Sequence, residues 1–127
     1  MDQVKEEKLT DSIATIDRLK QEVNAFVAER QWESFHSPKN LAMSIAIETA
    51  ELMEHFQWTN PSIPENPVGN DSPVAQELAD LFAYTLRLAE VLQIDLSEAL
   101  ALKMVRNRLK YPVGADYIPR DITRPES

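Results

Sequence analysis

The sequence contains no cysteine, and it has only two glycines and two histidines in 127 residues. Without cysteine there is no disulfide framework, no thiolate zinc site and no cysteine nucleophile. Two glycines are too few for a sheet-rich fold with tight turns, and neither glycine-rich phosphate motif (G-x-x-x-x-G-K or G-x-G-x-x-G) is present. His36 and His55 leave little scope for histidine chemistry. Any catalysis must therefore depend on other side chains.

Basic residues are also scarce, with 13 Lys and Arg against 21 Asp and Glu, a formal charge of −8. This balance argues against a nucleic-acid backbone as the partner. An acidic protein can still bind an anionic nucleotide when a divalent cation bridges the two. No apolar run reaches the roughly 18 residues that a membrane span needs, and the charged N-terminus does not resemble a signal peptide. We expect a cytoplasmic protein without a membrane partner.

The length predicts a single domain over residues 1–127, and the spacing of apolar residues predicts an all-α fold. Thr10 or Asp11 is expected to cap a first helix that ends near Arg30. Ser-Pro pairs are typical helix starts, because Ser caps the helix and Pro occupies its first position. They predict helices over 38–57 and 73–92, and a fourth runs from about 96 to just before Pro112. The loop 59–72 and the tails 1–8 and 113–127 are expected to be irregular.

Two acidic patterns, Glu48-x-x-Glu51 and Glu77-x-x-Asp80, lie within the apolar second and third helices. Residues three apart share one face of a helix, so each pattern presents a pair of carboxylates. If the two helices pack antiparallel, all four carboxylates converge. Clustered oxygens hold hard divalent cations such as Mg²⁺, and Mn²⁺ is an alternative. Either pair alone is more often an ordinary solvated face, but the apolar surroundings favour buried carboxylates that need a metal.

The acidic motifs are part of a longer resemblance. The chain resembles the MazG-like all-α nucleoside triphosphate pyrophosphohydrolases, and within them the dCTP pyrophosphatase branch, over roughly residues 19–112. Four blocks match in order: FVAERQWESFHSPKNL at 26–41, ELMEHFQW at 51–58, QELADL at 76–81 and KMVRNRLKYP at 103–112. A lone E-x-x-E would be weak evidence. One departure is Val23, where some members of the branch have a histidine.

The resemblance implies a four-helix bundle that hydrolyses a nucleoside triphosphate, dCTP or a modified dCTP first, to the monophosphate and pyrophosphate. It also implies a role in cleaning the nucleotide pool. The expected Mg²⁺ ligands and catalytic residues are Glu48, Glu51, Glu77 and Asp80. One of these carboxylates would accept the proton of the attacking water, with Glu51 the first choice, although the sequence does not decide which.

The resemblance further implies a set of substrate-binding residues. Trp32 and Trp58 would flank the base, and Asn107 would contact a pyrimidine edge. Tyr84 would approach the sugar near C2′, or it would only fill the core. Lys103 would contact the triphosphate, with Lys39 and Arg106 as weaker choices. For each cation a solvated surface position is about as good an explanation.

Several alternatives remain at the level of the sequence. A ferritin-like di-iron site needs Glu-x-x-His on two helices, and only Glu33-x-x-His36 fits, so we reject it. A helical oligomerisation or binding module without activity stays open. So does a family relative that prefers dUTP or a purine nucleotide, or one that acts on phosphoribosyl-ATP. The second helix is apolar on most sides, which predicts a homo-oligomer, a dimer or a tetramer.

Overall fold

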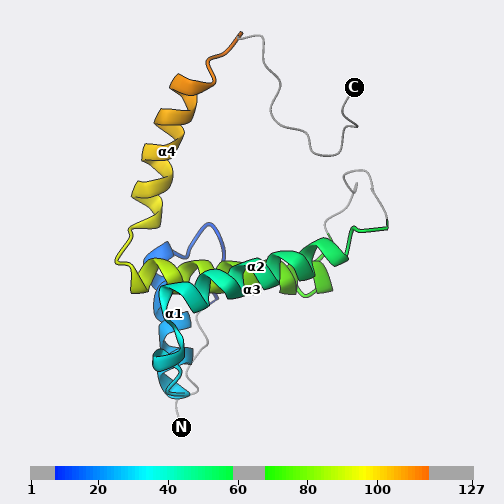
Figure 1. The fold of residues 1–127 in the computed structure, drawn as a ribbon, viewed down its shortest axis with the longest axis vertical. Coiled ribbons are helices and arrows are strands. Elements are labelled where there is room, and N and C mark those ends of the chain that lie inside the picture. Colours follow the sequence, from blue (N-terminus) through cyan, green and yellow to red (C-terminus); the bar gives the residue numbers. More distant parts are fainter. Residues whose placement is uncertain (1–7, 59–67, 115–127) are drawn as a thin grey trace. The chain divides into compact units, whose positions relative to one another are not determined.

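The computed structural model describes residues 8–58 and 68–114, and over these ranges it is all-helical, without a strand. The elements in chain order are α1 (Ile16–Glu29), a short 3₁₀ helix η1 (Glu33–Phe35), α2 (Pro38–Glu54), α3 (Pro73–Val91) and α4 (Leu96–Lys110) (Figure 1). The predicted all-α class and four main helices are confirmed. The chain forms two compact units, residues 1–95 and residues 96–127. α4 belongs to the second unit, so a single domain with all four helices in one bundle stays a prediction.

The starts of α2 and α3 confirm the two Ser-Pro signals. The Ser37 hydroxyl accepts a hydrogen bond from the Asn40 backbone N–H at 3.1 Å, and the Ser72 hydroxyl accepts one from the Ala75 N–H at 3.2 Å. In each helix the proline that follows occupies a first-turn position. There the N–H that proline lacks would have had no intrahelical partner.

The predicted start of the first helix is wrong. The cap is Thr15, whose hydroxyl accepts a hydrogen bond from the Arg18 backbone N–H at 3.1 Å, and α1 begins at Ile16. The carbonyl of Thr10 instead accepts the backbone N–H groups of Ile13 and Ala14 at 2.9 and 2.7 Å. Residues 10–14 therefore form a separate turn, and Thr15 rather than Thr10 or Asp11 caps the helix.

Two helices end in the same way, with a glutamine in the left-handed region. Gln31 follows α1 with φ 56°, and Gln93 follows α3 with φ 57°. After α1, the N–H groups of Trp32 and Gln31 donate to the carbonyls of Val27 and Ala28, both at 3.1 Å. After α3, the N–H groups of residues 94 and 93 donate to the carbonyls of residues 89 and 90. This paired arrangement is the Schellman motif, which satisfies the last helical carbonyls and turns the chain sharply.

Within residues 1–95, α2 and α3 lie side by side with opposite chain directions, and α1 crosses them at a steep angle (Figure 1). The buried apolar side chains of the described residues come from all three helices: Val27, Leu41, Leu86 and Ala89. Lys20 on α1 also donates from Nζ to the carbonyl of Ile94, just beyond α3, at 2.7 Å. The third helix is thus the element against which both others pack.

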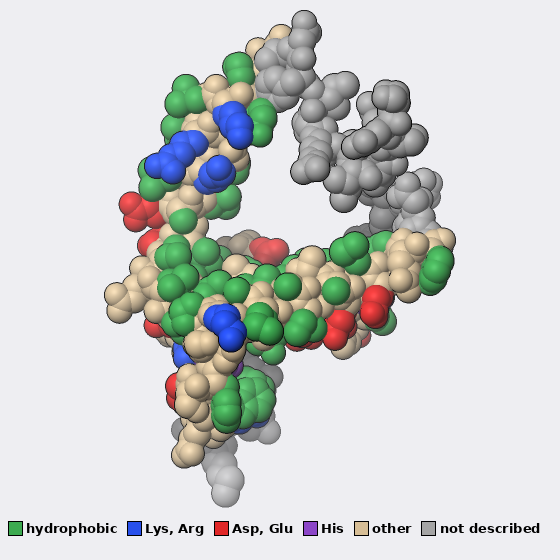
Figure 2. All heavy atoms as spheres, in the orientation of Figure 1, with side chains coloured by type: hydrophobic (Ala, Val, Ile, Leu, Met, Phe, Trp, Pro, Cys, Tyr) green, Lys and Arg blue, Asp and Glu red, His purple; other side chains and the backbone are tan. Residues whose placement is uncertain are grey.

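Much of the apolar surface of α2 and α3 is exposed. Met43 and Ile47 on α2 are 53% and 56% exposed, and Leu78 on α3 is 54% exposed. Figure 2 shows hydrophobic side chains spread along these two helices on the face that it presents. No helix among the described residues is both long and apolar enough to cross a membrane.

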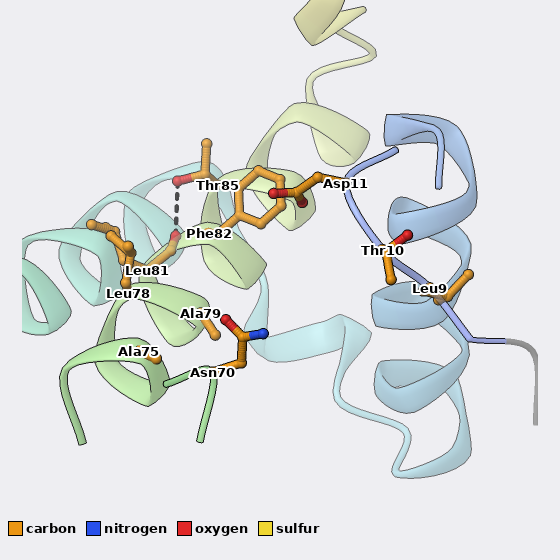
Figure 3. A pocket seen from close by; sticks show the side chains of 10 residues that line it. All are labelled: Leu9, Thr10, Asp11, Asn70, Ala75, Leu78, Ala79, Leu81, Phe82 and Thr85. Carbon is orange, nitrogen blue, oxygen red and sulfur yellow. Dashed lines mark hydrogen bonds between the residues drawn. The ribbon is translucent and has the colours of Figure 1, made fainter. Parts of the chain in front are cut away.

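An open groove of about 930 Å³ runs along one side of α3 (Figure 3). Its walls are mostly apolar, and its lining residues come from the N-terminal segment, from the turn before α3 and from α3 itself: Leu9, Thr10, Asp11, Asn70, Ala75, Leu78, Ala79, Leu81, Phe82 and Thr85. None of the predicted site residues is among them. The hydroxyl of Thr85 is already bonded to the carbonyl of Leu81 at 2.8 Å.

Candidate metal and nucleotide site

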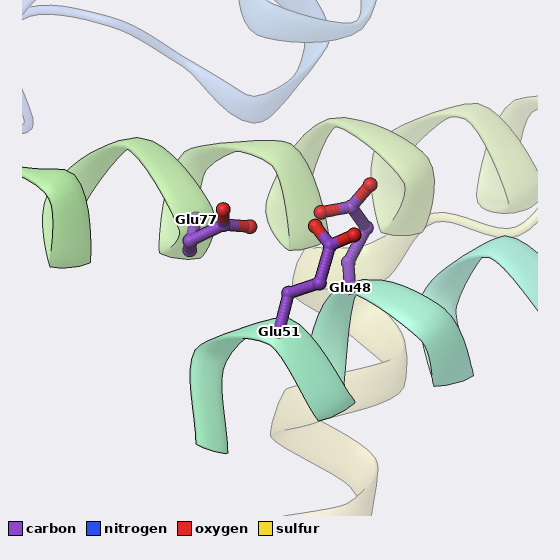
Figure 4. A group of neighbouring side chains, drawn as sticks. All are labelled: Glu48, Glu51 and Glu77. Carbon is purple, nitrogen blue, oxygen red and sulfur yellow. The ribbon is translucent and has the colours of Figure 1, made fainter. Parts of the chain in front are cut away.

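Three of the four predicted carboxylates come together in the structure. Glu48 and Glu51 project from α2 toward Glu77 on α3, and one oxygen from each lies within 4.8 Å of the others (Figure 4). The arrangement follows directly from the sequence, because residues 48 and 51 share a helix face and α3 runs antiparallel alongside it. We call these three residues the carboxylate cluster.

Two carboxylate oxygens of the cluster are buried without a hydrogen bond among the described residues. The Oε2 atoms of Glu48 and Glu77 are both buried, and neither has a hydrogen-bond partner among the described residues. A buried carboxylate oxygen without a partner is costly, and several like charges at this separation repel each other. Something must offset that cost, either a proton or a cation.

The same burial and crowding of carboxylates raise the pKa of Glu48. Burial raises the pKa of Glu48 from 4.5 to about 7, assisted by the neighbouring carboxyl groups of Glu77 and Glu51 and by the charge of Asp80. Without a cation, Glu48 therefore keeps its proton to a higher pH than an ordinary glutamate. A divalent cation at the cluster would favour the ionised form and reverse this shift.

Asp80 is exposed and lies one helical turn beyond Glu77 on α3. It is not one of the three converging residues, although its charge acts on Glu48. The cluster offers only carboxylate oxygens, with no sulfur and no histidine nitrogen. Hard cations such as Mg²⁺ and Mn²⁺ prefer such oxygen ligands. The residues present therefore fit the predicted metal, with Asp80 at the edge of the cluster.

Trp32 occupies the connector between α1 and α2 and is 43% exposed. Its ring contacts Phe26 edge-on, with centroids 5.6 Å apart and planes at 77°. Phe26 also makes a cation–π contact with Arg30, whose guanidinium lies 3.7 Å from the centre of the Phe26 ring. Trp32 is thus supported at an edge and retains exposed aromatic surface on which a base can stack.

Two further predicted residues lie in the same unit. Tyr84 is half-buried on α3, one turn after Asp80. Trp58 is 87% exposed beyond the end of α2, and among the described residues its ring is not paired with that of Trp32. Lys39 is exposed in the first turn of α2. The predicted loop 59–72 lies largely outside the described residues, as do most of the two predicted tails.

The remaining predicted residues belong to α4, in the unit of residues 96–127. Lys103 and Arg106 are exposed on this helix, and Asn107 is half-buried. This unit is separate from the one that holds the carboxylate cluster, so their roles at the nucleotide stay predictions. Val23 is half-buried on α1.

The sequence reasoning missed a polar network centred on Arg87. Its Nε donates to Nδ1 of His36 at 3.0 Å, and its Nη1 donates to the side-chain oxygen of Asn24 at 2.9 Å. Burial and the Arg87 charge lower the pKa of His36, against the opposing charge of Glu33. We call Arg87, His36 and Asn24 the Arg87 network. One signal was available: Arg87 is the single charged residue in the run from Leu81 to Ala89.

The fold and the carboxylate cluster define a class of protein. The profile of the MazG-like family matches residues 43–118, and the chain belongs to this family. Curated relatives include dCTP pyrophosphatase 1 from Mus musculus, 41% identical over 91 residues, and from Homo sapiens, 40% identical over 91 residues. These matches cover 69% and 68% of this chain but 54% and 53% of the relatives. The chain thus aligns with about half the length of the curated relatives.

A solved structure agrees with this assignment. A pyrophosphatase from Archaeoglobus fulgidus superposes with a TM-score of 0.68 at 40% sequence identity. The match covers 83% of this chain and 99% of the archaeal chain. The predicted family and its dCTP pyrophosphatase branch are thereby confirmed.

Proposed function

We propose that this protein is a Mg²⁺-dependent nucleoside triphosphate pyrophosphohydrolase that prefers dCTP or a modified dCTP. The observation that carries the proposal is the carboxylate cluster, with two buried oxygens that lack a partner among the described residues. The kinship with dCTP pyrophosphatases and with a solved pyrophosphatase supports the reaction and the nucleotide. Removal of surplus or modified dCTP from the nucleotide pool is the role that we infer.

Glu48, Glu51 and Glu77 would hold the cation, with Asp80 as the fourth ligand. When bound, Mg²⁺ neutralises charge on the phosphates and makes water more acidic. The carboxylates align the attacking water and accept its proton, and Glu51 is our first choice for that role. The water oxygen forms a bond to the α-phosphorus as the bond from that phosphorus to the bridging oxygen breaks. The products are the monophosphate and pyrophosphate.

The nucleoside would be held by aromatic and amide groups. Trp32 offers exposed aromatic surface for the base, and Trp58 is its proposed partner on the other side. Tyr84 follows Asp80 by four residues on α3, so it lies on the same face, where it would approach the sugar. Lys103 would bind the triphosphate and Asn107 the pyrimidine edge.

We further propose that the working form is a homo-oligomer, in which a second copy covers the exposed apolar face of α2 and α3. Met43 and Ile47 are one helical turn apart, and both are more than half exposed. A contiguous apolar face of this kind marks an interaction site on a protein in water. The same face would otherwise promote uncontrolled association.

The test is pyrophosphate release from the eight common nucleoside triphosphates, measured with Mg²⁺ and with a chelator. We expect Mg²⁺-dependent turnover led by dCTP, with dCMP as the second product. Turnover led by dUTP or a purine nucleotide would support the proposed reaction but refute the proposed recognition of cytosine by Trp32, Trp58 and Asn107. Absence of turnover on all eight and on 5-methyl-dCTP would favour the helical binding module.

A further inference from the structure

The connector that carries Trp32 is held in place from both of its ends. At its start, the left-handed Gln31 directs the chain so that the Trp32 N–H bonds to the Val27 carbonyl. At its end, Asn40 donates from Nδ2 to the Phe35 carbonyl at 3.0 Å. These bonds fix the connector against its own neighbouring helices, but neither of them reaches α3.

The Arg87 network supplies the link to α3. Arg87 on α3 bonds to His36 of the connector and to Asn24 of α1, so one guanidinium joins three elements. All three side chains are half-buried, so these bonds are partly shielded from competing water. Nδ1 of His36 accepts from Arg87, so this histidine is neutral with its proton on Nε2.

His36 and Trp32 flank a single 3₁₀ turn. The Trp32 carbonyl accepts the Phe35 N–H at 3.0 Å, and the Glu33 carbonyl accepts the His36 N–H at 3.1 Å. A turn this short transmits the position of one end to the other, because only a few backbone dihedrals separate them. Fixing the His36 ring therefore limits the movement of Trp32.

Arg87 lies in register with the proposed catalytic face of α3. Glu77, Asp80, Tyr84 and Arg87 follow each other at intervals of three, four and three residues, which places them along one helix face. From Glu77 to Arg87 this face is roughly 15 Å long at 1.5 Å per residue. An extended nucleoside triphosphate has a comparable length. The same helix therefore carries metal ligands near one end and the anchor of the aromatic connector near the other.

We propose that Arg87 is a positioning residue. Together with His36 and Asn24, it sets the distance between the Trp32 ring, on which the base would stack, and the carboxylate cluster. This inference rests on the proposed function. It assigns Arg87 no contact with substrate. Loss of the network would leave the cluster on α2 and α3 intact but let the connector move, so binding of the base would suffer more than the chemical step.

The test uses two substitutions and a matched control. Arg87→Met removes the guanidinium while keeping an unbranched side chain, and Asn24→Ala removes one of its acceptors with a better helix former. Arg18→Gln is the control: it removes the charge of an arginine on α1 that is paired with Glu22 at 2.8 Å and is not one of the three residues of the network. Helical circular dichroism verifies folding of each variant. If Arg87→Met does not fold, Asn24→Ala decides the question.

Two readouts separate a positioning role from a structural one. We expect the KM for dCTP to rise by about tenfold in Arg87→Met and less in Asn24→Ala, with kcat within about twofold of wild type. In a Trp58→Phe background, Trp32 is the sole tryptophan of the chain. There, both substitutions should lower its fluorescence anisotropy and weaken its quenching by dCMP without Mg²⁺.

Unchanged KM and Trp32 anisotropy, equal to those of Arg18→Gln, would overturn the proposal. A lower kcat at constant KM would overturn it too, because the network would then act on the chemical step. If the parent protein hydrolyses no nucleotide, the proposed function fails. The Trp32 anisotropy and the dCMP titration would still decide whether the network fixes the connector.

Discussion

Glu51 and Asp80 occupy different positions in this site, although the sequence predicts both as metal ligands. Glu51 is part of the carboxylate cluster, whereas Asp80 lies at its edge, one turn beyond Glu77. Both are proposed ligands, so removal of either charge should weaken cation binding and slow hydrolysis. The structure gives a reason to expect the larger loss at Glu51.

We predict that Glu51→Gln and Asp80→Asn each lower kcat/KM for dCTP by roughly 10²-fold or more, since each removes a proposed ligand or base. The helical circular dichroism should not change, because neither side chain is part of the apolar core. Glu90→Gln is the control, an exposed glutamate on the same helix as Asp80. Wild-type rates in either test variant would remove that carboxylate from the site.

The raised pKa of Glu48 predicts an unusual dependence of stability on pH. Its folded value of about 7 exceeds the ordinary 4.5, so the folded state binds this proton more tightly than the unfolded state. The resulting stabilisation is complete below the ordinary value and is lost as the pH rises through about 7. His36, with its lowered pKa, acts in the opposite direction, because its contribution is lost as the pH falls below 6.5.

The difference between wild type and Glu48→Gln isolates the Glu48 contribution. In a chelator, we expect the Tm of wild type relative to this variant to fall between about pH 5 and pH 8. Mg²⁺ should raise the wild-type Tm more at the higher pH, because the cation replaces the proton. A constant Tm difference across this range would show that Glu48 titrates as an ordinary glutamate.

At the scale of elements, the ends of α1 and α3 offer a direct test of backbone strain. Gln93 has φ 57°, a conformation that costs a residue with a Cβ roughly 1 kcal/mol more than glycine. We predict that Gln93→Gly stabilises the protein by about this amount. Thermal unfolding followed by circular dichroism measures it. Ala25→Gly, at an exposed position inside α1, should instead destabilise by about 1 kcal/mol. Destabilisation by both would contradict the strain at residue 93.

Local sequence signals predicted α2 and α3 well, because Ser37-Pro38 and Ser72-Pro73 each combine a cap with a first-turn proline. They failed for α1, where Thr10 or Asp11 was expected to cap the helix and the structure has Thr15 as the cap. The carboxylate cluster was predictable, since the three-residue spacing and one antiparallel pair suffice to assemble it. The Arg87 network was not, because it joins residues 51 and 63 positions apart and no local pattern encodes such pairs.

At the scale of the whole molecule, the exposed apolar face of α2 predicts self-association. Light scattering should report a dimer or a tetramer, and Met43→Glu should shift it toward the monomer by placing charge in the interface. Val113→Glu is the control, since Val113 is fully exposed and lies outside α2 and α3. A monomeric wild-type protein would refute the oligomer.

The central claim is that the carboxylate cluster binds a divalent cation, and Mn²⁺ titration followed by electron paramagnetic resonance tests it without relying on turnover. We predict saturable binding to wild type in the absence of nucleotide, competition by Mg²⁺, and at least about tenfold weaker binding in Glu77→Gln, which removes a ligand charge. Glu90→Gln should bind Mn²⁺ as wild type does. Equal Mn²⁺ binding by Glu77→Gln and wild type would contradict the account.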